Sequence, residues 1–408
     1  MLKASITALL GFWVGLATVH AEEWDWELGV EYRHLPQNLV YGGESDTLAG
    51  SVRLSRIEEW NQGSDLLEFD GFYRWSEADS QRSHGDIQDL AWIHVGDDWE
   101  LRTGFRTVFW GVTEFKHLVD IINQKDFVER IDGEARLGQP MVNLSLVQPW
   151  GILDLFALVG FRERTFAGRD GWPRGPLVVA DKGEQYESSR ENKRVDFALR
   201  WSQTLDSLEL AVSYFSGTSR EPEFHQTNAD GQWIPYYPII DQLGVEALYI
   251  VDLWILKLEA ISRSGMKNGR YMGATLGFEY TYEGVFDSVS DLGVVVEYNF
   301  DERGLSAPAT YFMENDLSLG LRWALNDEAS SVLLVGMIYD HKVNEKVILV
   351  EASRRLGAHW KLNLDATFFS SHSPPPLDVY LDGDHDPNYK LAINSHNDLI
   401  QLELIRYF

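Results

Sequence analysis

Side chains along most of this chain alternate between apolar and polar at every second position. The segment 194–201 reads Arg-Val-Asp-Phe-Ala-Leu-Arg-Trp, and the segment 316–323 reads Asp-Leu-Ser-Leu-Gly-Leu-Arg-Trp. Successive side chains of a β-strand point to opposite faces of its sheet, so each segment has one apolar and one polar face. The pattern predicts an all-β protein whose sheet has an apolar environment on one side and water on the other.

The same pattern predicts how the sheet is closed. Beyond residue 21 no apolar run reaches the ~20 residues that a helix needs to cross a bilayer, so a membrane-spanning form of this chain requires a sheet without free edges. Short turns such as 326–328 alternate with long connections such as 165–192. Aromatic residues stand at strand ends, where interfacial girdles lie in membrane barrels; they include Trp99, Trp201, Trp323 and Trp360. We expect a closed antiparallel transmembrane β-barrel of about 16–18 strands, since the alternation is ambiguous around 86–95 and 345–355.

The first 21 residues have the features of an export signal. Lys3 supplies the positive charge, 6–19 is apolar, and Ala21 ends a small-residue cleavage pattern. The apolar run is roughly 14 residues, shorter than the ~20 of a membrane anchor. We expect 1–21 to be cleaved and 22–408 to form a single barrel domain.

Composition excludes several classes of protein. The chain has 63 acidic and 35 basic side chains, a formal charge of −28, and no cysteine. This charge argues against nucleic-acid binding, because phosphate contacts need clustered Lys and Arg. The missing thiols exclude disulfide scaffolds and cysteine-ligated metal centres. No cofactor is expected.

The last strand gives the most specific local signal. The chain ends on Phe408, and three apolar residues precede it on the same strand face, Leu404, Leu402 and Ile400. This end resembles the terminal strand of Gram-negative outer-membrane β-barrels, although Arg406 stands where an apolar residue is more usual. The resemblance implies that the barrel-assembly machinery reads these four residues as its signal, and that the protein lies in the outer membrane among lipid and lipopolysaccharide.

A second resemblance lies in the middle of the chain. Trp110-Gly111, followed by the run from Asp120 to Asp126, is similar to a segment of poorly characterised proteobacterial porin-like barrels, with Gln124 where proline is usual. Residues 108–140 are too polar to face lipid and too long for a simple turn. We expect an inserted loop or a short amphipathic helix there, either folded into the lumen as a constriction or lying on the rim. The constriction candidates are Trp110, Glu114, Lys116, Asp120, Asn123 and Asp126.

If the apolar parity faces lipid, the opposite parity lines the lumen. A water-filled lumen accommodates these charged side chains, whereas an apolar core would not. The pore-lining candidates are Arg102, Arg106, Arg162, Arg164, Arg194, Asp196, Arg200 and Arg322. They are expected either to select solutes by charge or to pair with strand neighbours and stabilise the wall.

Other chemistry has little support in the sequence. Asp382, Asp384 and Asp386 alternate as in a calcium loop, but Pro387 and Ile393 occupy the positions where an EF-hand needs Gly and Glu. A solvated acidic loop is the preferred interpretation, so no metal is expected. The chain has no Gly-x-Ser-x-Gly and no His-Glu-x-x-His motif, so we do not expect an enzyme.

These features favour a porin, which is a channel for passive diffusion of small hydrophilic solutes. A barrel of 16–18 strands is wide enough for an aqueous path. The alternative is a structural or adhesive barrel whose loops, especially 165–192 and 217–238, bind a partner. A hydrolase is a third and weaker alternative.

Overall fold

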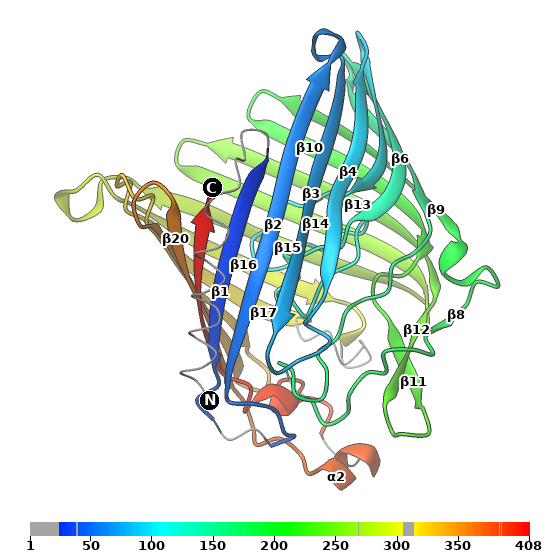
Figure 1. Cartoon of the computed structure of the whole chain (residues 1–408), viewed down its shortest axis with the longest axis vertical. Coiled ribbons are helices and arrows are strands. Elements are labelled where there is room, and N and C mark those ends of the chain that lie inside the picture. The colour runs from blue at the N-terminus through cyan, green and yellow to red at the C-terminus, as the bar shows by residue number, and fades with distance from the viewer. Residues whose placement is uncertain are drawn as a thin grey trace.

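The computed structural model describes residues 24–37, 40–173, 175–267, 269–304, 314–382, 384 and 386–408. The predicted export signal, 1–21, lies outside this part of the chain. The described residues form one tall barrel of inclined strands, with the longer loops at one end (Figure 1). We call this end the loop end, and the opposite end the turn end.

Eighteen of the described strands belong to one sheet. Each pairs antiparallel with its neighbours in chain order, and β1 also pairs with β21, so the sheet closes on itself. The prediction of a closed antiparallel barrel is confirmed, at the upper end of the predicted strand count. The eighteen strands are β1 (Asp25–His34), β2 (Asp46–Trp60), β3 (Asp65–Ser76), β4 (Gly85–Val95), β5 (Trp99–Arg106), β6 (Gln139–Gln148), β7 (Gly151–Val159), β9 (Val195–Leu205), β10 (Leu208–Thr218), β13 (Ile239–Val251), β14 (Trp254–Met266), β15 (Gly269–Tyr282), β16 (Asp291–Asp301), β17 (Asn315–Ala324), β18 (Val332–Asp340), β19 (Glu345–Arg355), β20 (Trp360–Ser370) and β21 (Leu399–Tyr407).

The two faces of the sheet differ as the alternation predicts. On β9, Phe197 is 59% exposed on the outside of the barrel, whereas the neighbouring Asp196 is 1% exposed. On β17, Leu321 is 49% exposed and Ser318 is fully buried. An isolated water-soluble sheet would cover such apolar side chains, so the outer face suits contact with lipid.

Short strands and helices lie at the two ends of the barrel. A second sheet at the loop end contains β8 (Gln185–Tyr186), β11 (Glu223–Thr227) and β12 (Trp233–Tyr237). The last long connection carries the helix α2 (Leu377–Asp382). Single turns of 3-10 helix occur at Asn61–Gly63, Glu191–Lys193, Val285–Asp287 and Ala392–Asn394. None of the helices in the described residues is long and apolar enough to span a membrane.

Residues 107–138 connect β5 to β6 and contain no helix. The alternative of a short amphipathic helix is wrong here, and the folded loop is correct. The apolar side chains of this segment are buried by the barrel wall and not by a helical partner, so their near-helical spacing does not report a helix. We call this segment the lumen loop.

Candidate channel and its constriction

The lumen loop packs against an apolar patch on the inside of the barrel. Trp110, Leu118, Val119, Ile121 and Ile122 of the loop are 0–5% exposed. They form one buried cluster with wall residues, and the Trp110 ring meets a wall aromatic ring at 5.7 Å, edge to face. The wall residues of this cluster are Met141, Phe156, Leu158, Ala198, Phe215, Ile240, Ile261, Met266 and Tyr271, on β6 to β15. Burial of this area ties the loop to one half of the wall.

Glu259 on β14 fixes the middle of the loop. Its carboxylate accepts hydrogen bonds from the backbone N–H of Val112, Thr113 and Val119, at 2.8, 3.0 and 3.2 Å, and from the Thr113 hydroxyl at 2.7 Å. The Glu259 side chain is completely buried. A buried carboxylate needs several donors to compensate for lost water, and the loop backbone supplies them.

The next stretch of the loop reaches the opposite side of the barrel. Glu297 on β16 accepts hydrogen bonds from the backbone N–H of Glu114 and Phe115, at 2.6 and 3.0 Å. The Phe115 ring lies over Gly320 and Gly336, where an added Cβ would come within 3.1 and 2.7 Å of it. Gly320 and Gly336 lie on β17 and β18, which are opposite β5 and β6 in the strand order. The loop therefore crosses the lumen.

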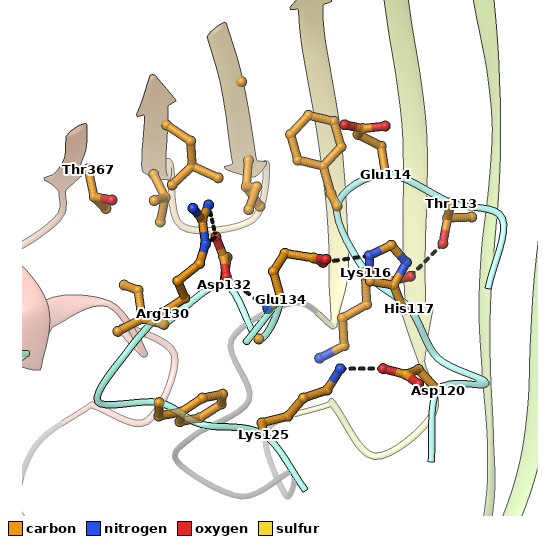
Figure 2. A pocket seen from close by; sticks show the side chains of 18 of the residues that line it. Thr113, Glu114, Lys116, His117, Asp120, Lys125, Arg130, Asp132, Glu134 and Thr367 are labelled. Atoms are coloured by element: carbon orange, nitrogen blue, oxygen red, sulfur yellow. Dashed lines mark hydrogen bonds and ion pairs between the residues drawn. The ribbon is translucent and has the colours of Figure 1, made fainter. Parts of the chain in front are cut away.

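Ion pairs hold the far part of the loop to β19, β20 and β3. The Arg130 guanidinium contacts Asp132, Glu351 and Asp365 at 2.5, 2.7 and 3.3 Å. Glu129 accepts from Arg74 of β3 at 2.9 Å. Figure 2 shows Arg130 and Asp132 beside the wall strands. The loop is therefore attached to opposite sides of the barrel wall.

Two cavities lie on either side of this crossing. The outer one, about 600 Å³, extends from the loop end, where Trp172, Tyr271 and Arg303 line it. The inner one, about 820 Å³, extends toward the turn end, where Glu27 and Ile405 line it. The two cavities adjoin, because eight residues line both: Glu114, Glu129, Glu134, Leu334, Arg130, Glu351, Asp365 and Gln401. We call these eight residues the passage.

The outer cavity has a cationic and an apolar side. One group of cations consists of Lys116, Arg164, Arg220, Arg263 and Arg303, and Arg33, Lys125 and Arg130 line other parts of the cavity. Three carboxylates pair with part of this set: Glu221 contacts Arg263 and Arg303 at 3.2 and 3.3 Å, Asp301 contacts Arg303 at 2.7 Å, and Asp196 contacts Arg220 at 3.0 Å. The apolar side is lined by Leu334, Ile338, Val347, Leu349, Phe369 and Leu399, on β18 to β21.

Burial and hydrogen bonding shift the pKa values of two side chains of the lumen loop near the passage. Burial lowers the pKa of Lys116 to about 8, although the carboxylate of Glu221 opposes the shift. The hydrogen bond from His117, 2.8 Å long, lowers the pKa of Glu134 to about 2. This contact and the pairing of Lys125 with Asp120 are visible in Figure 2. Glu134 is therefore a permanent anion at neutral pH.

The structure also gives a position to each pore-lining candidate. Arg322 lines the inner cavity and pairs with Glu114 at 2.5 Å, and Arg164 lines the outer cavity and donates to the Arg220 carbonyl at 2.6 Å. The remaining candidates form wall contacts: Arg102 with Glu100, Arg106 with Asn143, Arg162 with Asp86, Arg194 with Asp196, and Arg200 with Glu246. Arg162, Arg164 and Arg194 lie beyond the ends of β7 and β9, outside the strands on which the alternation placed them.

The constriction candidates have four different roles within the lumen loop. Glu114 and Lys116 face the cavities, and Trp110 is part of the apolar cluster. Asn123 closes the base of the loop, because its amide donates to the carbonyls of Arg106 and Leu137 at 2.8 Å. Two acids make further contacts: Asp120 pairs with Lys125 and Arg136 inside the loop, and Asp126 accepts from His84 and Thr165 outside it.

The assembly and calcium candidates lie apart from the lumen. Leu402 is 42% exposed on the outer face of β21, and Ile400 and Leu404 share its parity. Phe408 is 39% exposed and donates its backbone N–H to the Trp26 carbonyl at 3.0 Å. Asp382 ends α2 and is followed by Asp384 and Asp386, while Gly383 and His385 between them lie outside the described residues. Within the described residues no group of three or more acidic or histidine side chains is placed to hold a metal ion.

No protein-family model matches this chain, and no curated protein sequence does. Solved structures do. A BenF-like porin from Pseudomonas fluorescens Pf-5 matches 95% of this chain over 97% of its own length, with a TM-score of 0.53 and 9% identity. This chain has the porin fold. Pseudomonas aeruginosa OpdQ matches 95% of it over 98% of its own length, at TM-score 0.52 and 11% identity, and P. aeruginosa OccD3 (OpdP) matches 96% over 91%, at 0.51 and 10%. The porin-like resemblance of the sequence is confirmed at the level of fold.

Alternation alone missed the residues that hold the lumen loop of this porin fold. Phe156, Phe215 and Ile261 are apolar at the parity assigned to the lumen, and they are the wall on which the loop packs. These three residues interrupt the alternation of apolar and polar side chains, and this interruption is the sequence signal that could have identified them. Glu259 is a single acid at lumen parity between apolar outward residues, but nothing local connects it to Thr113.

Proposed function

We propose that this protein is an outer-membrane channel of a Gram-negative bacterium, through which small hydrophilic solutes diffuse passively. The observation that carries the proposal is the pair of adjoining cavities, which together follow the lumen from the loop end to the turn end. An apolar outer face and a lumen lined by charged groups are the two requirements for a water-filled pore in lipid. The fold is shared with solved porins, and this supports the same class of activity.

The proposal includes the targeting and assembly features of the sequence. The N-terminal signal, 1–21, takes the chain to the envelope and is removed there. Phe408 and the apolar residues before it on β21 are recognised during assembly, and the exposed outer face contacts lipid and lipopolysaccharide. The lumen loop acts as the constriction, and the remaining pore-lining candidates stabilise the wall through ion pairs and, for Arg106, a hydrogen bond to Asn143.

Liposome swelling tests the proposal. Vesicles containing the full mature protein are diluted into isotonic solutions of uncharged sugars of increasing size. We expect fast swelling with monosaccharides and progressively slower swelling with larger sugars, because the lumen loop narrows the path. A barrel that is folded, judged by heat-dependent gel migration, but admits no sugar would support the structural or adhesive alternative.

A pair of matched variants tests whether solutes cross the barrel through the passage. Glu134→Trp places a large ring in the space that both cavities share, whereas Glu44→Trp makes the same change on an exposed loop residue. The first variant should slow swelling and the second should not. Equal rates for both would show that solutes do not pass Glu134.

A further inference from the structure

The passage between the two cavities is strongly acidic. Its charged side chains are the carboxylates of Glu114, Glu129, Glu134, Glu351 and Asp365 and a single guanidinium, that of Arg130. The two remaining members, Gln401 and Leu334, carry no charge. A solute that moves from one cavity to the other has to cross this set.

Arg130 does not neutralise the passage. Its guanidinium is shared among three carboxylates, Asp132, Glu351 and Asp365, within 3.3 Å. One positive charge against three negative charges leaves an excess of negative charge at the tip of the lumen loop. The side chains of Arg130 and Glu351 are 39% and 43% exposed, so this excess is presented to water in the lumen.

The bases around the other passage carboxylates are shared in the same way. Arg322 contacts Glu114 and also Glu279, at 2.5 and 3.4 Å. Arg74 contacts Glu129, Glu403 and Glu31, and the last of these also contacts Arg33 and Arg82.

Glu134 accepts a hydrogen bond from His117 at 2.8 Å, and among the described residues no guanidinium pairs with it alone. Its basic neighbour Arg136 is 3.8 Å away and is 3.0 Å from Asp120, so that guanidinium is also shared. The Glu134 side chain is 44% exposed, and its low pKa keeps it ionised. Among the passage residues themselves, five carboxylates stand against one guanidinium, so the net charge of these side chains is negative.

The cations of the outer cavity do not reverse this charge. Their partners Glu221, Asp301 and Asp196 compensate part of them. Exposed charges are screened over about 8 Å at physiological ionic strength, so a permeating ion responds most to the charges that it passes at close range. Charge lining a constriction therefore dominates the selection of ions.

We infer that the passage prefers cations to anions, and that Glu134 and Glu351 are the residues that determine this preference. The inference rests on the proposed function and adds a class of solute to it. Glu134 and Glu351 are the most exposed carboxylates of the passage, and they come from its two sides, the lumen loop and β19. Small cations and solutes with a positively charged group are the favoured class.

Reversal potentials in planar bilayers test the inference. A tenfold KCl gradient across a membrane with the wild-type protein should give a permeability ratio of K⁺ to Cl⁻ of about 3 or more. The double variant Glu134→Gln/Glu351→Gln should bring this ratio at least halfway toward 1. Arg130→Gln should raise it, because the carboxylates around Arg130 lose their shared cation. Glu44→Gln removes one negative charge outside the passage and should leave the ratio unchanged.

The outcomes separate the inference from the proposed function. Open steps with a ratio of 1 or below would overturn the cation preference and leave the channel intact. A preference that persists in the double variant would overturn the assignment to Glu134 and Glu351. A folded barrel that carries no current would overturn the channel and the inference together.

Discussion

Glu259 on β14 accepts hydrogen bonds from both the backbone N–H and the hydroxyl of Thr113, which lies 146 positions earlier in the lumen loop. The contact joins two segments whose sequences give no sign of each other. It holds the insertion between β5 and β6 at a fixed position inside the lumen. Glu259 is therefore one of the contacts that set the size of the path.

Removal of this carboxylate should release the loop. In Glu259→Ala, the three backbone N–H groups lose their acceptor, and each of them left buried without a partner costs about 1–3 kcal/mol. The Thr113 hydroxyl keeps the Lys116 carbonyl as an acceptor at 2.7 Å. We expect larger, noisier single-channel conductance and faster proteolysis within 107–138, with unchanged barrel yield. Glu259→Gln keeps one acceptor oxygen and should be intermediate. Wild-type conductance and protection in Glu259→Ala would show that the loop is held without Glu259.

The contact between Phe115 and the glycines of β17 and β18 predicts a compensating pair of substitutions. A Cβ at Gly336 would lie 2.7 Å from the Phe115 ring, so Gly336→Val overpacks the site and should cost about 1–3 kcal/mol of stability. The temperature of the heat-dependent gel shift should fall. Adding Phe115→Ala removes the clash and should recover most of the loss. If the double variant is less stable than Gly336→Val, the ring does not lie over Gly336.

Assembly should depend on the terminal aromatic residue. Phe408→Ala should reduce the amount of folded barrel in the outer-membrane fraction several-fold, because the terminal strand loses the aromatic end that it shares with other outer-membrane barrels. Phe286→Ala is the matched control, since Phe286 is an exposed aromatic at a turn, 82% exposed. Equal yields of the two variants would contradict an assembly role for Phe408.

Ion preference should change with pH through Lys116. Burial lowers the pKa of this amine to about 8, against the carboxylates of Glu221 and Asp301, while Arg164 and Arg303 favour the neutral form. Lys116 is charged below this pKa and neutral above it. Raising the pH from 7 to 9 therefore removes a positive charge from the outer cavity, and the preference for K⁺ should rise by about 1.5- to 2-fold. Lys116→Met should lose this step, and a variant that keeps it would assign the step to another group.

The strand architecture could be predicted because its signal is local. Alternation is visible within most of the long strands, although it is ambiguous in β4 and β19. The lipid-facing parity of β9 and β17 follows from Phe197 and Leu321 without knowledge of their partners. The ends of the strands are harder to predict, because the alternation of apolar and polar side chains can continue in the sequence after the backbone has left the sheet. Arg162 and Arg164 show this, because they follow β7 instead of belonging to it.

The constriction could be predicted only in outline. The length and polarity of 108–140 indicated an insertion, but not which wall it would meet. Phe115, Leu118 and Ile122 have near-helical spacing, yet they are ordered by contacts with distant strands. The passage acids come from both the loop and β19 and β20, so their grouping depends on the closed barrel. Contacts over more than 200 positions, such as Arg130 with Glu351, need the three-dimensional structure.

The most direct test of the account is a single thiol in the passage. The chain has no cysteine, so the Glu134→Cys variant carries a single thiol. Single-channel recording should show open steps for the wild type that a methanethiosulfonate reagent leaves unchanged. The steps of Glu134→Cys should fall when the same reagent is added. Silent but folded wild-type barrels, or unchanged current in a fully labelled Glu134→Cys channel, would contradict a water-filled path past the lumen loop.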